Sequence, residues 1–200
     1  MSNSPSPPRH CAQNFLRRGA ILLACFLATA GATEAAAQTT VEVRSASLSL
    51  DQEVYELDAR IEVRLPDDAR KAIEAGLTMR LNYEIQLARV RSYLPDPTAA
   101  ELTQSYELNY HALSQRWLVR NLNTGEQMDF GTLPSALEKL CDVRGLPVAD
   151  AALVEPDHSY EARIRAVVDL YAGSDALRWI LFWTDDWSAT SEWFEWPLRP

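Results

Sequence analysis

Alternation of apolar and polar residues runs through several stretches of the chain and predicts β-strands. In residues 54–65, VYELDARIEVRL, every second side chain from Tyr55 to Leu65 is apolar and the positions between them are charged. Residues 41–50, 77–90 and 159–170 also alternate. Successive side chains of a strand point to opposite faces, so each strand is expected to have one packed face and one wet face.

Polar turns between these segments predict antiparallel connections. Asp51-Gln52 joins residues 41–50 to residues 54–65 and indicates a hairpin. The stretch 92–101, SYLPDPTAAE, is the most loop-like part of the chain because it holds two prolines. A meander is predicted after it, with strands at 105–113, 116–121 and 127–130 and turns near Leu113-Ser114 and at Asn123-Thr124-Gly125.

Two short helices interrupt the strands. The first is predicted in residues 67–76, with Asp67 as its N-cap and Gly76 at its C-terminal end. The second is predicted in residues 132–143, with Thr132 as its cap and Pro134 in its first turn. An apolar stripe at helical spacing in the second helix includes Cys141. Residues 147–154, PVADAALV, are ambiguous and could form a turn of helix.

This order of elements predicts the fold class. Runs of half-buried strands broken by single helices favour antiparallel sheet over a parallel doubly wound fold, in which strand and helix alternate throughout. We therefore expect one α+β domain over residues 38–200, mainly antiparallel. Its sheet arrangement is predicted as a sandwich or a strongly curved sheet with two or three short helices.

The N-terminus has the layout of a secretion signal. Arg17-Arg18 precede the apolar run of residues 19–32, which is shorter than the roughly 20 residues that a spanning helix needs. Ala35 and Ala37 fit an A-x-A cleavage site, which would make Gln38 the first residue of the mature chain. We expect residues 1–37 to be a signal peptide and the protein to be periplasmic or secreted. The alternatives are an uncleaved inner-membrane anchor and acylation at Cys25.

Charge and cysteine content narrow the partners. The net charge of the chain is −9 and becomes −11 without residues 1–37, because three arginines and Glu34 leave with them. Nucleic acid is therefore an unsuitable partner, since binding it requires clustered cations. Cys141 is then the single cysteine and cannot form an internal disulfide, so we interpret it as a thiol of the core.

Sequence signals for catalysis are weak. His111 and His158 lie in different segments without a metal ligand at suitable spacing, and His111 is expected on the surface. The chain has no G-x-S-x-G motif and no glycine-rich phosphate loop. Paired acids such as Asp67-Asp68 and Asp185-Asp186 could hydrolyse a glycoside but fit a helix start and a turn. No enzyme activity, cofactor or metal is therefore indicated.

The C-terminal stretch 179–196, WILFWTDDWSATSEWFEW, holds five of the six tryptophans. Residues 174–183 could be a helix or a strand, followed by a turn at Asp185-Asp186. Residues 191–198 are predicted to form a closing strand, with Trp193 on one face and Phe194 on the other. Rings on both faces indicate that both faces are covered or that one meets a partner.

Two interpretations of this stretch stay open, core packing and a binding surface. In the predicted strand the two glutamates also fall on opposite faces, so neither is expected to be simply exposed. The candidate residues for binding a ligand or partner are Trp187, Trp193, Trp196, Glu192 and Glu195.

Residues 108–140, LNYHALSQRWLVRNLNTGEQMDFGTLPSALEKL, followed by YEARIRAVVDL and DDWSATSEWFEW, resemble the DUF4390 family of exported proteobacterial proteins. The resemblance covers nearly all of the chain after residue 37. Its most specific parts are residues 110–114 together with Trp187, Ser191, Trp193 and Trp196. It implies export, a single domain and a setting near a membrane sensor kinase of the nitrogen-regulation type. It implies no catalytic residues.

Three functions follow as hypotheses. The first is a non-catalytic envelope module that binds a protein partner, which the weak catalytic signals and the aromatic closing strand favour. The second is a carbohydrate or peptidoglycan binder, or a weak hydrolase, that uses the C-terminal tryptophans and glutamates. The third is a purely structural domain. The sequence leaves the ligand and the oligomeric state open.

Overall fold

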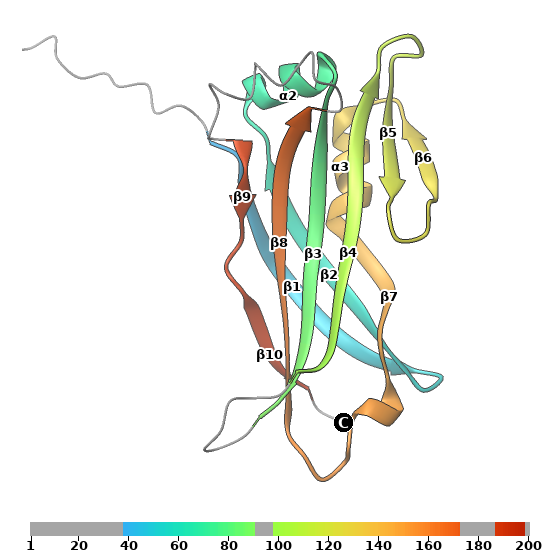
Figure 1. The fold of residues 1–200 in the computed structure, drawn as a ribbon, viewed down its shortest axis with the longest axis vertical. Helices are drawn as coiled ribbons and strands as arrows, with labels where there is room; N and C mark the ends of the chain where they lie inside the picture. The colour runs from blue at the N-terminus through green and yellow to red at the C-terminus, as the bar shows by residue number, and fades with distance from the viewer. Residues whose placement is uncertain (1–37, 91–97, 173–186, 199–200) are drawn as a thin grey trace, which may run out of the picture. The chain divides into compact units, whose positions relative to one another are not determined.

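A computed structural model describes residues 38–90, 98–172 and 187–198 of the chain. Within these residues most of the chain forms antiparallel strands in two sheets, accompanied by two α-helices (Figure 1). The inner faces of the sheets share one hydrophobic core, which confirms the α+β class with mainly antiparallel strands. No helix in the described part of the chain is long and apolar enough to cross a membrane.

The smaller sheet contains three strands in the order β1-β2-β7. They are β1 (Thr40–Asp51), β2 (Val54–Arg64) and β7 (Asp142–Asp150). The predicted hairpin joins β1 and β2, and its turn lies at Gln52-Glu53, one residue later than expected. Both turn residues have positive φ, 43° and 75°, as in the tight turns that match the twist of a hairpin.

A β-bulge in β1 keeps its apolar side chains on one face. Val43 pairs with Ile61, but Ser45 already pairs with Arg60, so Arg44 is an extra residue without a cross-strand partner. The inward positions therefore change from Val41 and Val43 to Ala46 and Leu48, which pair with buried residues of β2. A bulge inserts one residue and shifts the alternation by one position, which matches this change.

The larger sheet has the order β10-β8-β3-β4-β5-β6, and β9 also pairs with β8. Its strands are β3 (Leu77–Arg89), β4 (Thr98–His111), β5 (Arg116–Asn121), β6 (Gln127–Phe130), β8 (Tyr160–Ala172), β9 (Ala189–Thr190) and β10 (Phe194–Leu198). The central strand β3 pairs with β8 on one side and β4 on the other. Its predicted inward side chains are all buried: Leu77, Met79, Leu81, Tyr83, Ile85 and Leu87.

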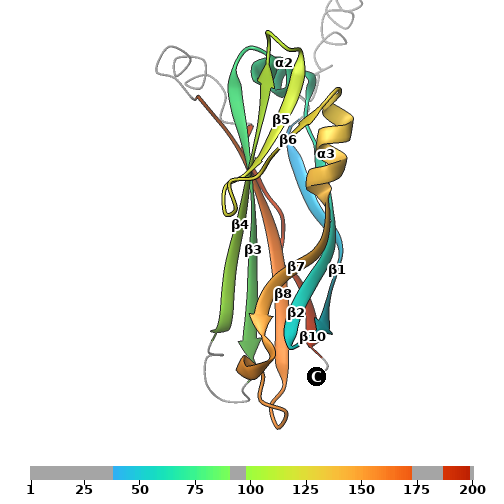
Figure 2. The same ribbon diagram turned by 90° about the vertical axis from the view of Figure 1, so that its right-hand side faces the viewer.

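Helix α3 (Leu133–Cys141) contacts β2 and β7 of the smaller sheet and β5 and β6 of the larger one (Figure 2). The predicted cap is present, since the Thr132 hydroxyl accepts a hydrogen bond from the Ser135 amide at 3.4 Å. The Tyr83 hydroxyl, fully buried in β3, donates to the Leu140 carbonyl at 2.5 Å. This bond satisfies one of the carbonyls that the last turn of a helix leaves without an internal partner.

Helix α2 (Asp67–Glu74) begins one residue earlier than predicted. Asp67 is its first helical residue rather than its N-cap, and Pro66 occupies the cap position with extended backbone and no side-chain hydrogen bond. Pro66 suits that position because its φ of −65° leads directly into a helix and it has no amide to satisfy. Asp67 and Asp68 lie in the first turn, where carboxylates oppose the helix dipole. Gly76 follows the helix with φ of 109°.

Two further segments differ from the sequence predictions. Residues 147–150 belong to β7, and only Ala151–Leu153 form a single 3₁₀ turn, η1. Pro147 is compatible with a strand here because β7 is an edge strand of its sheet. Strand β4 begins at Thr98, inside the stretch predicted as a loop. Residues 1–37, 91–97 and 174–183 and the turn at Asp185-Asp186 lie outside the described residues, so the predictions for them stay predictions.

Candidate functional site: a groove between two edge strands

The three candidate tryptophans in the described part of the chain do not share one surface. Trp196 pairs with buried Ala162 across β8, so it faces the core side of the larger sheet. It packs against Phe194, with the ring centres 5.9 Å apart. Trp187 also packs against the main core. Both indoles are half-buried, which supports the core interpretation for these two residues.

Trp193 lies on the opposite side of the larger sheet. It precedes β10 rather than belonging to it, which corrects the predicted strand boundary. The guanidinium carbons of Arg163 and Arg165 lie 4.8 and 4.6 Å from the centre of its ring. Both arginines are fixed from β3, because Arg163 donates to Gln86 at 2.8 Å and Arg165 to Glu84 at 2.6 Å. On the side of the sheet that faces away from the core, the ring of Trp193 therefore contacts two arginines of the same chain.

The two candidate glutamates are exposed, contrary to the prediction that neither would be. Glu195 lies on the outer face opposite Arg163, with its carboxylate 3.9 Å from the guanidinium. Glu192 lies in the irregular segment between β9 and β10. That segment leaves the regular ladder, so the alternation assumed from the sequence does not apply to Glu192.

A groove lies where the free edges of the two sheets meet. Strand β1 pairs only with β2, and β10 pairs only with β8, within the part of the chain that the structure describes. The groove between them has a volume of about 620 Å³. Residues 40–44 of β1 form one wall, residues 190–194 form the other, and Glu62 and Arg64 of β2 complete the lining.

The second wall is also bulged. Thr190 pairs with Val167 and Phe194 with Ile164, so three residues, Ser191 to Trp193, lie opposite two residues of β8. Ser191 maintains the contact across this bulge. Its amide donates to the Ala166 carbonyl and its hydroxyl accepts from the Ala166 amide, both at 2.9 Å. These two hydrogen bonds hold Ser191 against β8 at a point where the regular strand ladder is interrupted.

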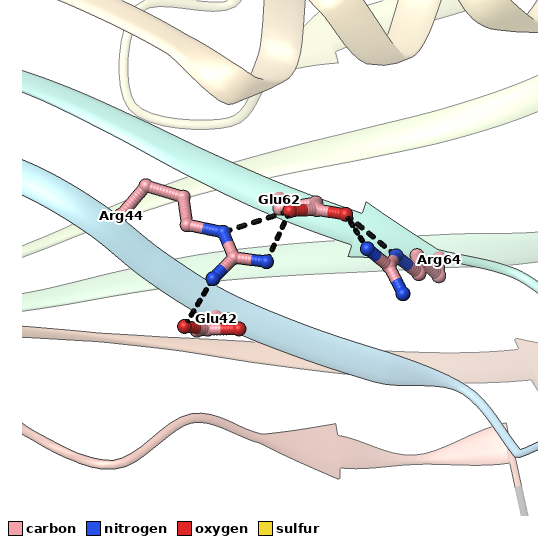
Figure 3. Close-up of polar contacts among 4 residues, drawn as sticks. All are labelled: Glu42, Arg44, Glu62 and Arg64. Atoms are coloured by element: carbon pink, nitrogen blue, oxygen red, sulfur yellow. Dashed lines mark hydrogen bonds and ion pairs between the residues drawn. The ribbon is translucent and has the colours of Figure 1, made fainter.

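Four charged side chains, two from β1 and two from β2, form a chain of ion pairs along the groove (Figure 3). Arg44, the bulged residue, donates to Glu62 at 2.7 Å and to Glu42 at 2.5 Å. Arg64 binds the other oxygen of Glu62 at 2.5 Å. The hydrogen bond to Glu62 raises the pKa of Arg44, and the bonds from Arg44 and then Arg64 lower the pKa of Glu62. Both groups therefore carry full charge at neutral pH.

The other reactive side chains that the sequence indicated are located away from this groove. His111 is exposed at the end of β4, with its Nδ1 2.8 Å from the Ser114 hydroxyl. Cys141 is half-buried at the end of α3, and burial raises the pKa of its thiol to about 11. Among the described residues no group of three or more His, Cys, Asp or Glu side chains is arranged to hold a metal ion.

The groove could not be predicted from the sequence because it is formed by strands that are distant along the chain. The apolar positions of residues 41–50 do contain a signal, since they shift from Val41 and Val43 to Ala46 and Leu48. That shift identifies the bulge at Arg44. Nothing in the local pattern shows that β9 and β10 approach β1, because those contacts join residues about 150 positions apart.

Comparison with known families gives one result. The family model described as "Domain of unknown function (DUF4390)" matches residues 38–197. Comparisons with curated proteins and with solved structures found no match. The matched region contains both walls of the groove and every described strand except Leu198, the last residue of β10.

Proposed function

Since the chain belongs to the DUF4390 family, whose description assigns no activity, we propose that it is a non-catalytic interaction module of the cell envelope. The module binds a segment of a partner protein in the groove between β1 and the β9–β10 segment. The N-terminal signal pattern supports the envelope setting.

One observation carries this proposal: two strand edges, one from each sheet, line the same groove, and neither is paired with a strand of the described residues. A free strand edge presents backbone amides and carbonyls that another chain can pair with. Many peptide-binding domains use this mode, in which an extended segment extends a sheet. The groove volume of about 620 Å³ is within the range of known ligand sites.

The electrostatics of the groove support binding over catalysis. General acid–base chemistry works best when a group has a pKa near the working pH. The pKa of Glu62 is lowered and the pKa of Arg44 is raised, so both move away from neutrality. These side chains are suited to fixed charge recognition and poorly suited to moving protons.

Carbohydrate binding, the alternative, has less support from the geometry. Stacking on a sugar chain favours aromatic rings side by side on an accessible surface. Here Trp187 and Trp196 pack on the core side, and Trp193 lies over two arginines on the outer side. Of the three candidate tryptophans in the described residues, Trp193 is the one on the outer face that a glycan could contact, beside Arg163, which also approaches Glu195.

Site-specific photo-crosslinking in intact cells tests the proposal. A photoreactive residue at Glu42 or Thr190, one on each wall, should give a reproducible protein adduct. The same residue at Gln127, exposed on the distant edge strand β6, should not. A membrane sensor kinase, the setting that the family resemblance implies, is the first partner to look for. Absence of an adduct from both walls, or identical adducts from all three positions, would contradict the proposal.

The envelope setting has its own test. Export with cleavage after Ala37 gives a mature chain that begins at Gln38. Cell fractionation followed by intact-mass measurement should find this species in the periplasm. A chain that retains residues 1–37 in the membrane fraction would support the anchored alternative and contradict cleavage.

A further inference from the structure

The two bulges limit the length of any strand that the groove can take. On the β1 side the regular edge runs from Thr40 to Val43 and is interrupted at Arg44. On the other side the wall spans residues 190–194. Bulges end regular pairing, since the residue they insert breaks the ladder. The groove therefore suits a short extended segment of about five residues, rather than a long strand.

The burial pattern of β1 determines which side chains of that segment must be apolar and which must be polar. Val41 and Val43 point inward and are only 9% and 8% exposed, and Phe194 packs toward the core from the opposite wall. Glu42 and Arg44 point outward and are exposed. An added strand follows the same alternation as its neighbour. Its inward side chains must therefore be apolar and its outward side chains polar.

The charges along the groove favour a basic side chain on the outward face. Three glutamates, Glu42, Glu62 and Glu192, line the groove with two arginines, Arg44 and Arg64. Glu62 is bound by both arginines, whereas Glu42 contacts only one nitrogen of Arg44 and is 61% exposed. Opposite charges directly across a strand pair are stabilising. An incoming lysine or arginine is thus expected to form its most favourable ion pair at Glu42.

We infer that the groove binds a short extended peptide in which apolar residues alternate with polar ones and a basic residue lies opposite Glu42. The peptide adds to the Thr40–Val43 edge of β1 through backbone hydrogen bonds. This inference rests on the proposed function and names the chemistry of the partner segment. The acidic net charge of the chain, −9, adds a weaker attraction for such a peptide.

Binding of synthetic peptides to the full chain tests the inference by fluorescence anisotropy. The probe is a labelled seven-residue peptide in which valines alternate with serines and the central outward residue is lysine. Replacing that lysine by glutamate should weaken binding about tenfold or more. In the Glu42→Lys variant the preference should reverse. Glu126→Lys, the same charge change at an exposed residue outside the groove, should leave the preference unchanged.

Backbone methylation separates strand addition from contact through side chains alone. In an edge pair only every second amide of the added strand faces β1. N-methylation of one alternate set should abolish binding, and N-methylation of the other set should leave it intact. Equal effects from both sets would overturn strand addition.

The remaining outcomes are distinguishable. A groove adduct in cells together with no preference for the lysine peptide overturns the inference and leaves the proposed function standing. No adduct and no peptide binding overturn both, and the bulges and charges then act only to protect the edges from aggregation. A concentration-dependent dimer that Glu42→Lys dissociates would identify a second copy of the chain as the occupant and overturn the peptide assignment.

Discussion

The guanidinium of Arg165 lies 4.6 Å from the centre of the Trp193 ring and also donates a hydrogen bond to Glu84 at 2.6 Å. The three side chains form a row across the outer face, from the segment before β10 through β8 to β3. This row attaches the irregular wall of the groove to the central strand of the larger sheet. Trp193 thus has a structural role that its position in the sequence does not show.

Removal of the Trp193 ring should weaken this attachment. Trp193→Ala loses the contacts with both Arg163 and Arg165, and we expect the free energy of unfolding to fall by about 1 kcal/mol or more. Trp193→Phe keeps an aromatic face and should lose less. Urea denaturation followed by circular dichroism measures both variants. Equal losses in the two variants would show that the cation contacts contribute nothing.

Deletion of Arg44 should be tolerated about as well as its substitution. Val43 and Ser45 already pair with the consecutive residues Ile61 and Arg60, so the deletion removes the bulge and leaves Val41 and Val43 facing the core. Arg44→Ala keeps the bulge and removes only exposed ion pairs, so its stability should also stay close to that of the unaltered chain. Thermal unfolding of both variants measures the two effects. A melting temperature that falls much further in the deletion variant would contradict the assignment of Arg44 as an extra residue in an otherwise continuous register.

Loss of the Tyr83 hydroxyl should destabilise the fold despite a nearly unchanged shape. Tyr83→Phe leaves the Leu140 carbonyl without this donor in a buried site, at a cost of about 1–3 kcal/mol. Chemical denaturation provides the measurement, with near-ultraviolet circular dichroism as the check that the core stays packed. Amides in the last turn of α3 should also exchange faster with solvent. Unchanged stability and exchange would contradict the capping role of Tyr83.

The Cys141 thiol should make stability depend on alkaline pH. Burial raises its pKa from 9.0 to about 11, so the folded state holds the proton after the unfolded state has lost it. Its contribution is therefore complete below pH 9 and is lost as the pH rises toward 11. The difference in unfolding free energy between the unaltered chain and Cys141→Ala should shrink over this range, by on the order of 2 kcal/mol. A constant difference would show that the thiol is accessible to water.

The strands that local pattern alone could predict are those with one continuous alternation. Residues 54–65 and 159–170 match β2 and β8 closely because alternate residues are buried, from Tyr55 to Ile61 in β2 and from Tyr160 to Leu170 in β8. Helix α3 was predicted with its cap because Thr132 and Pro134 are local signals. Strand β7 was missed because Gly145 and Pro147 interrupt its pattern. Gly145 has φ of 59° at an irregular point of the pairing with β2, a conformation that glycine adopts without strain.

The candidate site was only partly predictable for a different reason. The aromatic and acidic residues near the C-terminus were identified from composition, and Trp193, Glu192 and Phe194 do line the groove. The opposite wall, residues 40–44, was missed because its role depends on the contact between two sheets. Trp187 and Trp196 were grouped with Trp193 by proximity in sequence, yet Trp187, just before β9, and Trp196, through its position in β10, both pack against the core. Pairing register, which no single segment encodes, separates these residues.

The pairing of β3 with β8 has a consequence for how the chain folds. Arg89 pairs with Tyr160 and Leu77 with Ala172, separations of 160 − 89 = 71 and 172 − 77 = 95 residues. The central strand β3 therefore cannot complete its pairing until β8 has been synthesised, whereas the β1–β2 hairpin can form early. Chains dominated by such distant pairings fold in milliseconds to seconds, far more slowly than helical domains. Until Ala172 is available, one edge of β3 stays open, and the nascent chain is most prone to association during that interval.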